Sequence, residues 1–318
     1  MPESAAPTSL ELCAGGGGQA LGIEQAGFRH LALVDNDTFA VATLRQNRPQ
    51  WLVYEEDLKH FVSDHLTEYV GRVDLVAGGV PCPPFSIAGK QLGHEDERDL
   101  FPTALAIVKR VKPRAIMLEN VRGLMEPRFA SYRQGLDEQF GEMGYRSEWR
   151  LLHASDFGVP QLRPRVVCVA MRKSLMRKFS WPEPLSESAQ SVGEILRPLM
   201  ASRGWKEADV WARRANRIAP TLVGGSKKHG GPDLGPTRAR RAWAELGVDG
   251  LGLANTPPEP DFSGAPKLTV EMAALLQGFP PNWQFIGGKT AAYRQVGNAF
   301  PPPVARAVAE RIRIALQS

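Results

Sequence analysis

The chain has 318 residues, enough for one large domain or two, and its 43% hydrophobic and 23% charged residues are typical of a water-soluble globular protein. No apolar stretch approaches the roughly 20 residues that a membrane-spanning helix needs, and residues 1–9 lack the basic start and apolar core of a signal peptide. The three cysteines, Cys13, Cys82 and Cys168, give neither a disulfide framework nor a paired metal-ligand spacing. We therefore expect a cytoplasmic protein with no membrane association and no metal site.

Short apolar runs alternate with helical patterns through the first half of the chain. The apolar runs predict strands at residues 9–13, 31–34, 73–77, 115–118 and 166–170. The helical patterns cover residues 19–26, 39–46, 100–111 and 132–143. Strands that alternate with helices form βαβ units, so the sequence predicts an α/β fold with a doubly wound, mainly parallel sheet. Ligands of such folds bind at the carboxyl ends of the strands.

The composition changes after about residue 174, where Pro, Gly, Arg and Trp become more frequent and periodicity fades. Residues 203–241 hold ten Lys or Arg against three Asp or Glu, a net charge of +7, so the rest of the chain sums to −2 of the overall +5. Helical patterns return at residues 270–276 and 304–316. We expect a larger domain of residues 1–173 plus 265–318 and a smaller, irregular domain of residues 174–264. The basic excess favours a polyanionic partner, although a merely solvated basic face would show the same charge.

A glycine run follows the first predicted strand, in the sequence Leu-Glu-Leu-Cys-Ala-Gly-Gly-Gly-Gly of residues 10–18. Glycines allow a tight turn and close approach of a ligand to the backbone, and the following helix adds backbone donors. Asp35 ends the second strand about 20 residues later, where an acid can bind ribose hydroxyls. Together these features predict a nucleotide-type cofactor, although an ordinary turn and a capping aspartate would explain each one alone. The loop lacks the Lys-Ser/Thr ending of an ATP-cradling loop.

Three further groups of residues carry candidate chemistry. Cys82 lies between prolines on a stiff turn after a predicted strand. It could be a nucleophile or a small buried hydrophobic residue, and only catalytic partner residues elsewhere in the chain would favour the nucleophile. Glu119 follows the buried run 116–118 and could donate a proton if apolar walls raise its pKa, or could simply cap the next segment. Arg163 and Arg165 alternate in extended backbone, so both would point to one face and could bind a phosphate or a carbonyl, or be a solvated pair.

Taken together, these motifs resemble the DNA cytosine-5 methyltransferases. The resemblance rests on Pro81-Cys82, Glu119-Asn120-Val121 and Gln161-x-Arg163-x-Arg165, in that order behind a glycine-rich loop. Residues 217–221 (Arg-Ile-Ala-Pro-Thr) and 297–301 (Gly-Asn-Ala-Phe-Pro) resemble the last two motifs of the family, so the match spans nearly the whole chain. The resemblance implies a bacterial modification-type enzyme that transfers a methyl group from S-adenosyl-methionine to carbon 5 of a flipped-out cytosine in duplex DNA.

The resemblance also implies roles for the catalytic residues. Cys82 would add to carbon 6 of the cytosine, and Glu119 would hold or protonate ring nitrogen 3. Arg165 would contact the base carbonyl, and Arg163 would support Glu119 or a phosphate.

In the cofactor site, Asp35 would bind the ribose and Asp57 the adenine amino group. The family commonly has an aromatic residue at Cys13 and a large one at Asn36, so we expect weaker adenine contacts here, with Phe39 or Leu58 as substitutes. The full set of cofactor residues implied by the resemblance is Cys13, Ala14, Gly15, Gly17, Gly18, Asp35, Asn36, Asp57, Leu58, Pro81, Leu100, Asn298 and Ala299.

The larger domain would then be catalytic and cofactor-binding, and the smaller one would recognise the DNA target. The implied DNA contacts are Ser86, Lys90, Gln91, Arg217, Thr221, Lys227 and Lys228, with residues 87–98 as a mobile loop. We expect a monomer on double-stranded DNA at the nucleoid, with a cognate restriction endonuclease acting separately. The alternatives are a transfer-RNA cytosine-5 methyltransferase, a non-catalytic DNA-binding homologue and, from the glycine loop alone, a nicotinamide oxidoreductase.

Overall fold

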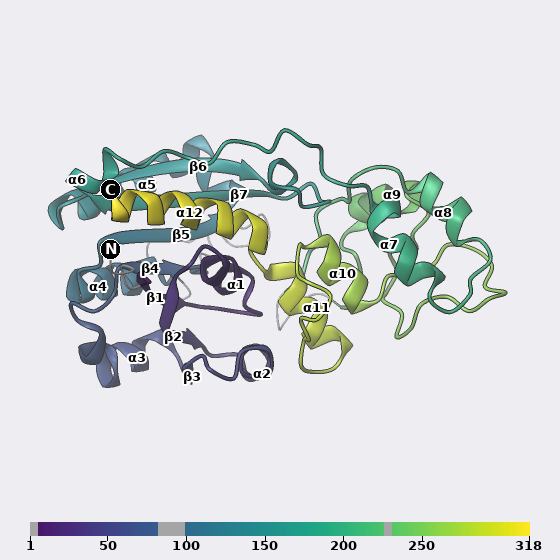
Figure 1. Ribbon diagram of the computed structural model, residues 1–318, viewed down its shortest axis with the longest axis horizontal. Helices are drawn as coiled ribbons and strands as arrows, with labels where there is room; N and C mark the ends of the chain where they lie inside the picture. Colours follow the sequence, from purple (N-terminus) through teal and green to yellow (C-terminus); the bar gives the residue numbers. More distant parts are fainter. Residues whose placement is uncertain (1–5, 82–98, 226–230) are drawn as a thin grey trace, which may run out of the picture. The chain divides into compact units, whose positions relative to one another are not determined.

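The computed structural model describes residues 6–81, 99–225 and 231–318 of the chain. The chain forms two compact units (Figure 1). Unit 1 comprises Met1–Leu152, Pro164–Glu183 and Val304–Ser318, and unit 2 comprises His153–Arg163 and Pro184–Pro303. By compactness, residues 265–303 therefore group with unit 2. The functional division at residues 174 and 264 stays a prediction.

Unit 1 is built on one sheet, which in the described part of the chain has seven strands in the order β3-β2-β1-β4-β5-β7-β6. The strands are β1 Thr8–Leu12, β2 Arg29–Asp35, β3 Val53–Glu55, β4 Leu75–Gly78, β5 Ala115–Val121, β6 Tyr145–His153 and β7 Pro164–Arg172. Strands β1 to β5 are parallel to one another, whereas β7 runs antiparallel to β5. The prediction of an α/β fold with a mainly parallel sheet is confirmed.

Helices pack on both faces of this sheet. They are α1 Gly18–Gln25, α2 Thr38–Asn47, α3 Leu58–Asp64, α4 Phe101–Val111, α5 Ala130–Glu142, α6 Lys173–Met176 and α12 Pro302–Gln317. Short 3-10 turns cover Leu66–Tyr69, Arg122–Met125, Pro127–Phe129 and Ala154–Phe157. Every strand and helix that the apolar patterns predict is present within a few residues. The prediction missed β3, α3, α6 and β6. In β6 only Tyr145 and Leu152 are buried, so this strand has no continuous apolar run.

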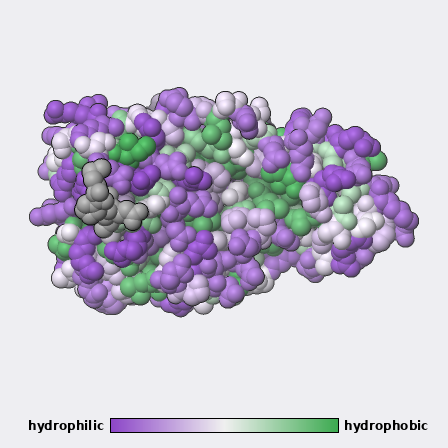
Figure 2. Space-filling model, viewed as in Figure 1, coloured by the Kyte–Doolittle hydropathy of each residue, from purple (hydrophilic) through white to green (hydrophobic). Residues whose placement is uncertain are grey.

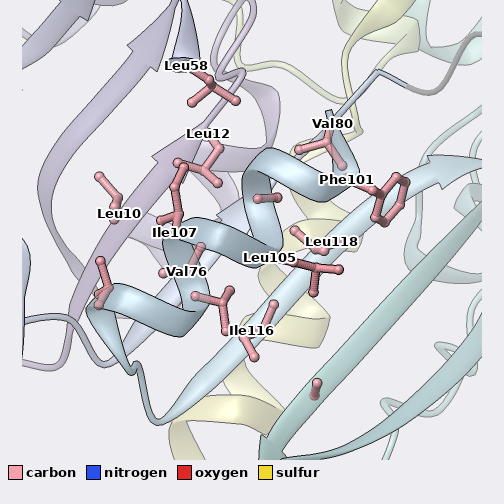
Figure 3. Packing of buried hydrophobic residues seen from close by; sticks show 14 of the residues in the cluster. Leu10, Leu12, Leu58, Val76, Val80, Phe101, Leu105, Ile107, Ile116 and Leu118 are labelled. Carbon is pink, nitrogen blue, oxygen red and sulfur yellow. The ribbon is translucent and has the colours of Figure 1, made fainter. Parts of the chain in front are cut away.

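Strand alternation determines which side chains enter the main core. Leu10 and Leu12 of β1 and Ile116 and Leu118 of β5 lie in one buried cluster with α4, as Figure 3 shows. Successive side chains on a strand point to opposite faces, so Glu119 points to the other face of the sheet. Each such buried aliphatic side chain contributes roughly 1.5–3 kcal/mol to the free energy of unfolding. The core thus fixes the face on which Glu119 lies.

His30 of β2 ties β1 and α1 together on that second face. Its Nε2 lies 2.9 Å from the Ala20 carbonyl oxygen and its Nδ1 lies 2.9 Å from Ser9 Oγ. The imidazole also meets the Trp51 ring edge-on, with centroids 4.9 Å apart. Burial lowers the pKa of His30 to about 4. The neutral ring therefore donates from Nε2 and accepts from the Ser9 hydroxyl at Nδ1.

Unit 2 contains the helices α7 Val192–Ala201, α8 Ala208–Arg214, α9 Thr237–Glu245, α10 Val270–Leu276 and α11 Lys289–Asn298. Ser191 and Glu194 form a capping box at the start of α7. Trp205, Trp211 and Trp243 are buried and supply much of the packing. The sequence patterns predicted α10 but none of α7, α8, α9 and α11.

None of the helices in the described part of the chain is long and apolar enough to cross a membrane. On the face shown in Figure 2, hydrophilic residues cover most of the surface of each unit.

Candidate active site

The five parallel strands bring the candidate residues of unit 1 to one edge of the sheet. The segments that follow or end these strands are the glycine loop after β1, Asp35 on β2, Asp57 after β3, residues 79–81 after β4 and Glu119 on β5. Parallel strands end on the same side, which is where ligands bind in doubly wound folds. Residues more than 100 positions apart in the sequence therefore form one candidate site.

Glu119 and Arg165 form a buried ion pair at this edge. Arg165 Nε lies 2.8 Å from Glu119 Oε1, and the two side chains are only 14% and 10% exposed. Antiparallel pairing of β5 with β7 places Arg165 opposite Val121, one diagonal step from Glu119. Burial lowers the pKa of Arg165, and the Glu119 carboxylate acts in the opposite direction. The pair presents a fixed carboxylate and a fixed guanidinium, which can hold a planar polar ligand.

The chain leaving β4 runs beside Glu119. A Cβ atom added at Gly79 would lie 3.2 Å from Glu119 Oε2, a tight contact that would require the carboxylate to shift by a few tenths of an ångström. Asn120 donates from Nδ2 to the Val80 carbonyl oxygen at 3.0 Å. The Leu100 amide donates to the Pro81 carbonyl oxygen at 3.3 Å, which brings two predicted cofactor residues together. This segment thus leads directly from the ion pair to Cys82.

The glycine loop and Asp35 contact each other. The Gly15 amide donates to Asp35 Oδ2 at 2.7 Å, and the Asp37 amide donates to Asp35 Oδ1 at 2.8 Å. Gly15 and Gly17 adopt positive φ angles of 52° and 87°, which glycine tolerates, and nothing lies within 4 Å of a Cβ added at Gly15. The loop therefore leaves open space directly beside a fixed carboxylate.

Acidic groups surround Cys13, which itself adopts a positive φ of 52°. Burial raises the pKa of its thiol, and the negative charges of Asp35, Asp57 and Glu11 raise it further. Asp57 caps α3 by accepting the Lys59 amide at 2.8 Å, and the next residue, Leu58, is buried. This part of the site favours a cationic ligand, because two carboxylates lie near one small side chain.

Two motifs of unit 2 are held together by Arg163. This side chain is fully buried and donates to the carbonyl oxygens of Leu222 at 2.8 Å, Gly297 at 2.7 Å and Ala299 at 2.9 Å. Arg163 and Arg165 belong to different compact units, Arg163 closing one segment of unit 2 and Pro164 opening β7. The Arg163 contacts support the two motifs of unit 2, and its predicted role beside Glu119 stays a prediction.

The model of the C-5 cytosine-specific DNA methylase family matches residues 8–313. The chain belongs to this family. The predicted family and enzyme class are therefore confirmed, and the protein is a DNA cytosine-5 methyltransferase.

Curated relatives of this methyltransferase cover nearly all of it. A type II methyltransferase, M.NaeI, from Lentzea aerocolonigenes is 59% identical over 310 residues, which are 96% of this chain and 75% of the relative. Another type II methyltransferase, M.NgoMIV, from Neisseria gonorrhoeae is 52% identical and is covered to 98%, as is this chain. Among solved structures, the Dnmt2 methyltransferase of S. pombe has a TM-score of 0.63 at 15% identity, with 98% of each chain covered. A prophage-encoded E. coli protein assigned as a DNA modification methyltransferase has a TM-score of 0.68 at 21% identity and covers 98% of this chain. The solved structures confirm the fold.

The remaining predicted contact residues of the methyltransferase lie in unit 2. Asn298 ends α11 and donates from Nδ2 to the Gly225 carbonyl oxygen at 3.1 Å, and the Ala299 carbonyl oxygen also accepts from Gln277. Arg217 pairs with Glu245 at 3.0 Å on the surface. The Thr221 hydroxyl donates to the Leu162 carbonyl oxygen. To contact DNA, Arg217 and Thr221 would therefore have to exchange or share these protein partners.

Some predicted residues lie outside the described part of the chain. They are Cys82, Ser86, Lys90, Gln91, Lys227 and Lys228, together with the predicted loop at residues 87–98. Of the remaining cofactor residues, Ala14 is buried, Asn36 is exposed and Phe39 is 44% exposed. No group of three metal-ligating side chains occurs among residues 6–81, 99–225 and 231–318.

Two buried polar residues near the site were missed by the sequence reasoning. Gln19 of α1 donates to the Met117 carbonyl oxygen at 3.4 Å, and its Oε1 has no hydrogen-bond partner among the described residues. That Oε1 lies 3.9 Å from the position a Gly79 Cβ would occupy, next to Glu119. Glu11, in the middle of β1, is fully buried, and burial raises its pKa well above the usual range. The sequence did hold a signal for each residue. Glu11 is a charged residue inside an apolar strand, and Gln19 is a polar residue at the start of the helix after the glycine loop.

Proposed function

We propose that the protein methylates carbon 5 of a flipped-out cytosine within a specific duplex DNA sequence, with S-adenosyl-methionine as the methyl donor and a covalent adduct through Cys82. The observation that carries this proposal is the buried Glu119–Arg165 pair beside residues 79–81, the segment that leads into Cys82. It supplies one group for the ring nitrogen and one for the carbonyl of a cytosine.

The donor set of unit 1 fits S-adenosyl-methionine, which carries a sulfonium and an ammonium charge. The open space at Gly15 and the carboxylates near Cys13 suit a cationic nucleoside. Asp35, which accepts the Gly15 and Asp37 amides, would bind the ribose hydroxyls, and Asp57 would accept from the adenine amino group. When bound, the cofactor supplies an electrophilic methyl group for carbon 5. The remaining cofactor residues listed from the family resemblance stay part of this proposal.

The protein residues activate the cytosine, because carbon 5 alone is a poor nucleophile. The Cys82 thiolate, a few per cent of the thiol at neutral pH unless the site favours it, forms a bond to carbon 6. Glu119 takes up a proton when the base binds and donates it to ring nitrogen 3 as the electron pair of the 5,6 double bond moves into the ring, while Arg165 donates hydrogen bonds to the base carbonyl. The proton returns from nitrogen 3 to Glu119 when carbon 5 takes up the methyl group. The absence of a side chain at Gly79 leaves the carboxylate undisplaced for this transfer. After methylation, loss of the carbon 5 proton to a base restores the double bond and expels the Cys82 thiolate.

The target carbon cannot be reached inside a duplex, so the base must leave the stack. We propose that residues 174–264 form the target-recognition domain and that their basic excess binds phosphates. Ser86, Lys90, Gln91, Arg217, Thr221, Lys227 and Lys228 are the proposed DNA contacts, and residues 87–98 the loop that closes over the base.

The relatives from Lentzea aerocolonigenes and Neisseria gonorrhoeae are type II methyltransferases. By this similarity we propose that the protein is a modification enzyme of the cytoplasm whose cognate endonuclease acts separately and which works as a monomer. Light scattering of the enzyme with and without a DNA duplex measures the stoichiometry.

Trapping on DNA that contains 5-fluorocytosine tests the mechanism. Fluorine cannot leave carbon 5 as a cation, so the methylated adduct persists, and wild type should shift in a denaturing gel when S-adenosyl-methionine is present. Cys82→Ser should give no adduct, and Glu119→Gln should form it at a reduced rate. Absence of the wild-type adduct would refute the nucleophile and favour the non-catalytic homologue. Faster methylation of transfer RNA than of duplex DNA would favour the transfer-RNA enzyme.

A further inference from the structure

Unit 2 contains a small hollow that the proposed mechanism does not use. Its volume is about 330 Å³, and it is lined by Val223, Gly225, Gly231, Asp233, Gly235, Pro236 and Arg240. Three of the seven lining residues are glycines, so much of the wall is bare backbone. Asp233 and Arg240 are the charged side chains of this lining, and they carry opposite signs.

Local structure holds both charged side chains in place. The Gly235 amide donates to Asp233 Oδ1 at 2.9 Å, which fixes the carboxylate and leaves it further acceptor capacity. Gly235 has φ 102°, a conformation that favours glycine, so the turn that holds Asp233 depends on glycine at position 235. Arg240 lies on α9, and its side-chain stem packs against Gly250, where an added Cβ would be 3.1 Å away. One donor of its guanidinium reaches Thr237 Oγ1 at 3.3 Å, which leaves the others for a ligand.

The combination of charges favours base edges over phosphates. A carboxylate in the lining repels a phosphate, whereas an arginine can donate two hydrogen bonds to guanine O6 and N7 and an aspartate can accept from the cytosine amino group. Both groups are available in the major groove of a G·C pair. Arg238 and Arg241 of the same helix are exposed and are not part of the lining, so they suit phosphate contact.

We propose that Asp233 and Arg240 are specificity-determining residues that read a G·C pair of the recognised sequence from this hollow. This inference rests on the proposed sequence-specific DNA methylation. Each such contact discriminates against the wrong base by about 5- to 150-fold.

The test compares the methylation preference of variants on a library of random duplexes, read by bisulfite sequencing. Asp233→Asn replaces an acceptor with a donor at equal size, and Arg240→Lys keeps the charge but loses the two-pronged contact. Arg240→Ala is a third variant, and thermal melting identifies any variant that fails to fold. The matched controls are Arg238→Ala and Arg241→Ala on the same helix.

We expect the Asp233 and Arg240 variants to lose about 5- to 150-fold of the preference at one G·C position while preferences elsewhere persist. The controls should weaken binding to all sequences alike and reduce its salt dependence. Unchanged preference in folded Asp233→Asn and Arg240→Lys, with an active and selective wild type, would overturn this inference alone. A wild type without sequence preference would overturn the proposed function as well.

Discussion

The buried pair of Arg165 and Glu119 gives the sharpest quantitative prediction. Their charged atoms lie 2.8 Å apart, and neither side chain is more than 14% exposed. At an effective dielectric constant near 20, two unit charges about 4 Å apart attract by about 4 kcal/mol. Removing one partner leaves a buried charge without its counterion, so Arg165→Met should lower the free energy of unfolding by about 3–5 kcal/mol.

A double-mutant cycle with Glu119→Gln, followed by urea denaturation, measures the coupling between the two side chains. We expect a coupling of about 3–4 kcal/mol. Arg306 and Glu310 of α12 are the matched control, because the same two atoms lie 2.7 Å apart but the side chains are 55% and 37% exposed. That exposed pair should couple by about 0.3–0.5 kcal/mol. A coupling of the Arg165–Glu119 pair as small as that of the control would refute the role assigned to burial.

Three further predictions follow from single positions. Burial lowers the pKa of His30 from about 6.5 to about 4, so its contribution to the free energy of unfolding is fully present above pH 6.5 and is lost as the pH falls towards 4. About 3 kcal/mol should disappear over this range. His30→Gln should remove this pH dependence from denaturation curves. Gly297→Ala would place a Cβ 2.4 Å from the backbone nitrogen of Gly224. We expect the free energy of unfolding, measured by thermal melting, to fall by at least about 1–3 kcal/mol. A melting temperature equal to that of wild type would contradict this packing. Gly79→Ala would place a Cβ 3.2 Å from Glu119 Oε2 and so displace the carboxylate. We expect kcat for DNA methylation to fall about 10- to 100-fold with little change in melting temperature. An unchanged kcat would show that the reaction tolerates this displacement.

Much of the site was predictable because its residues sit in short, ordered motifs. The apolar runs placed the strands within a few residues, and glycine, proline and charged residues at the strand ends marked the loops where a ligand binds. Those local signals sufficed to place Asp35 and Glu119 at the carboxyl-end halves of their strands and to identify the family, whereas the site roles of these residues stay predictions. They did not suffice for Glu11 and Gln19, whose importance lies in burial that no local pattern reveals.

By itself, the sequence determined most strands and helices of the larger domain, the residue types of the site and the likeness to the cytosine-5 methyltransferases, because periodicity and motif spacing are local properties. Only the tertiary structure decided which groups meet. Arg163 and Arg165 are two residues apart, yet one donates to three carbonyl oxygens of unit 2 and the other pairs with Glu119 in unit 1. The hollow lined by Asp233 and Arg240 likewise depends on a turn and a helix packing together. Hydrogen-bond partners and burial come from segments distant in the chain, and pairing of strands and packing of helices set both.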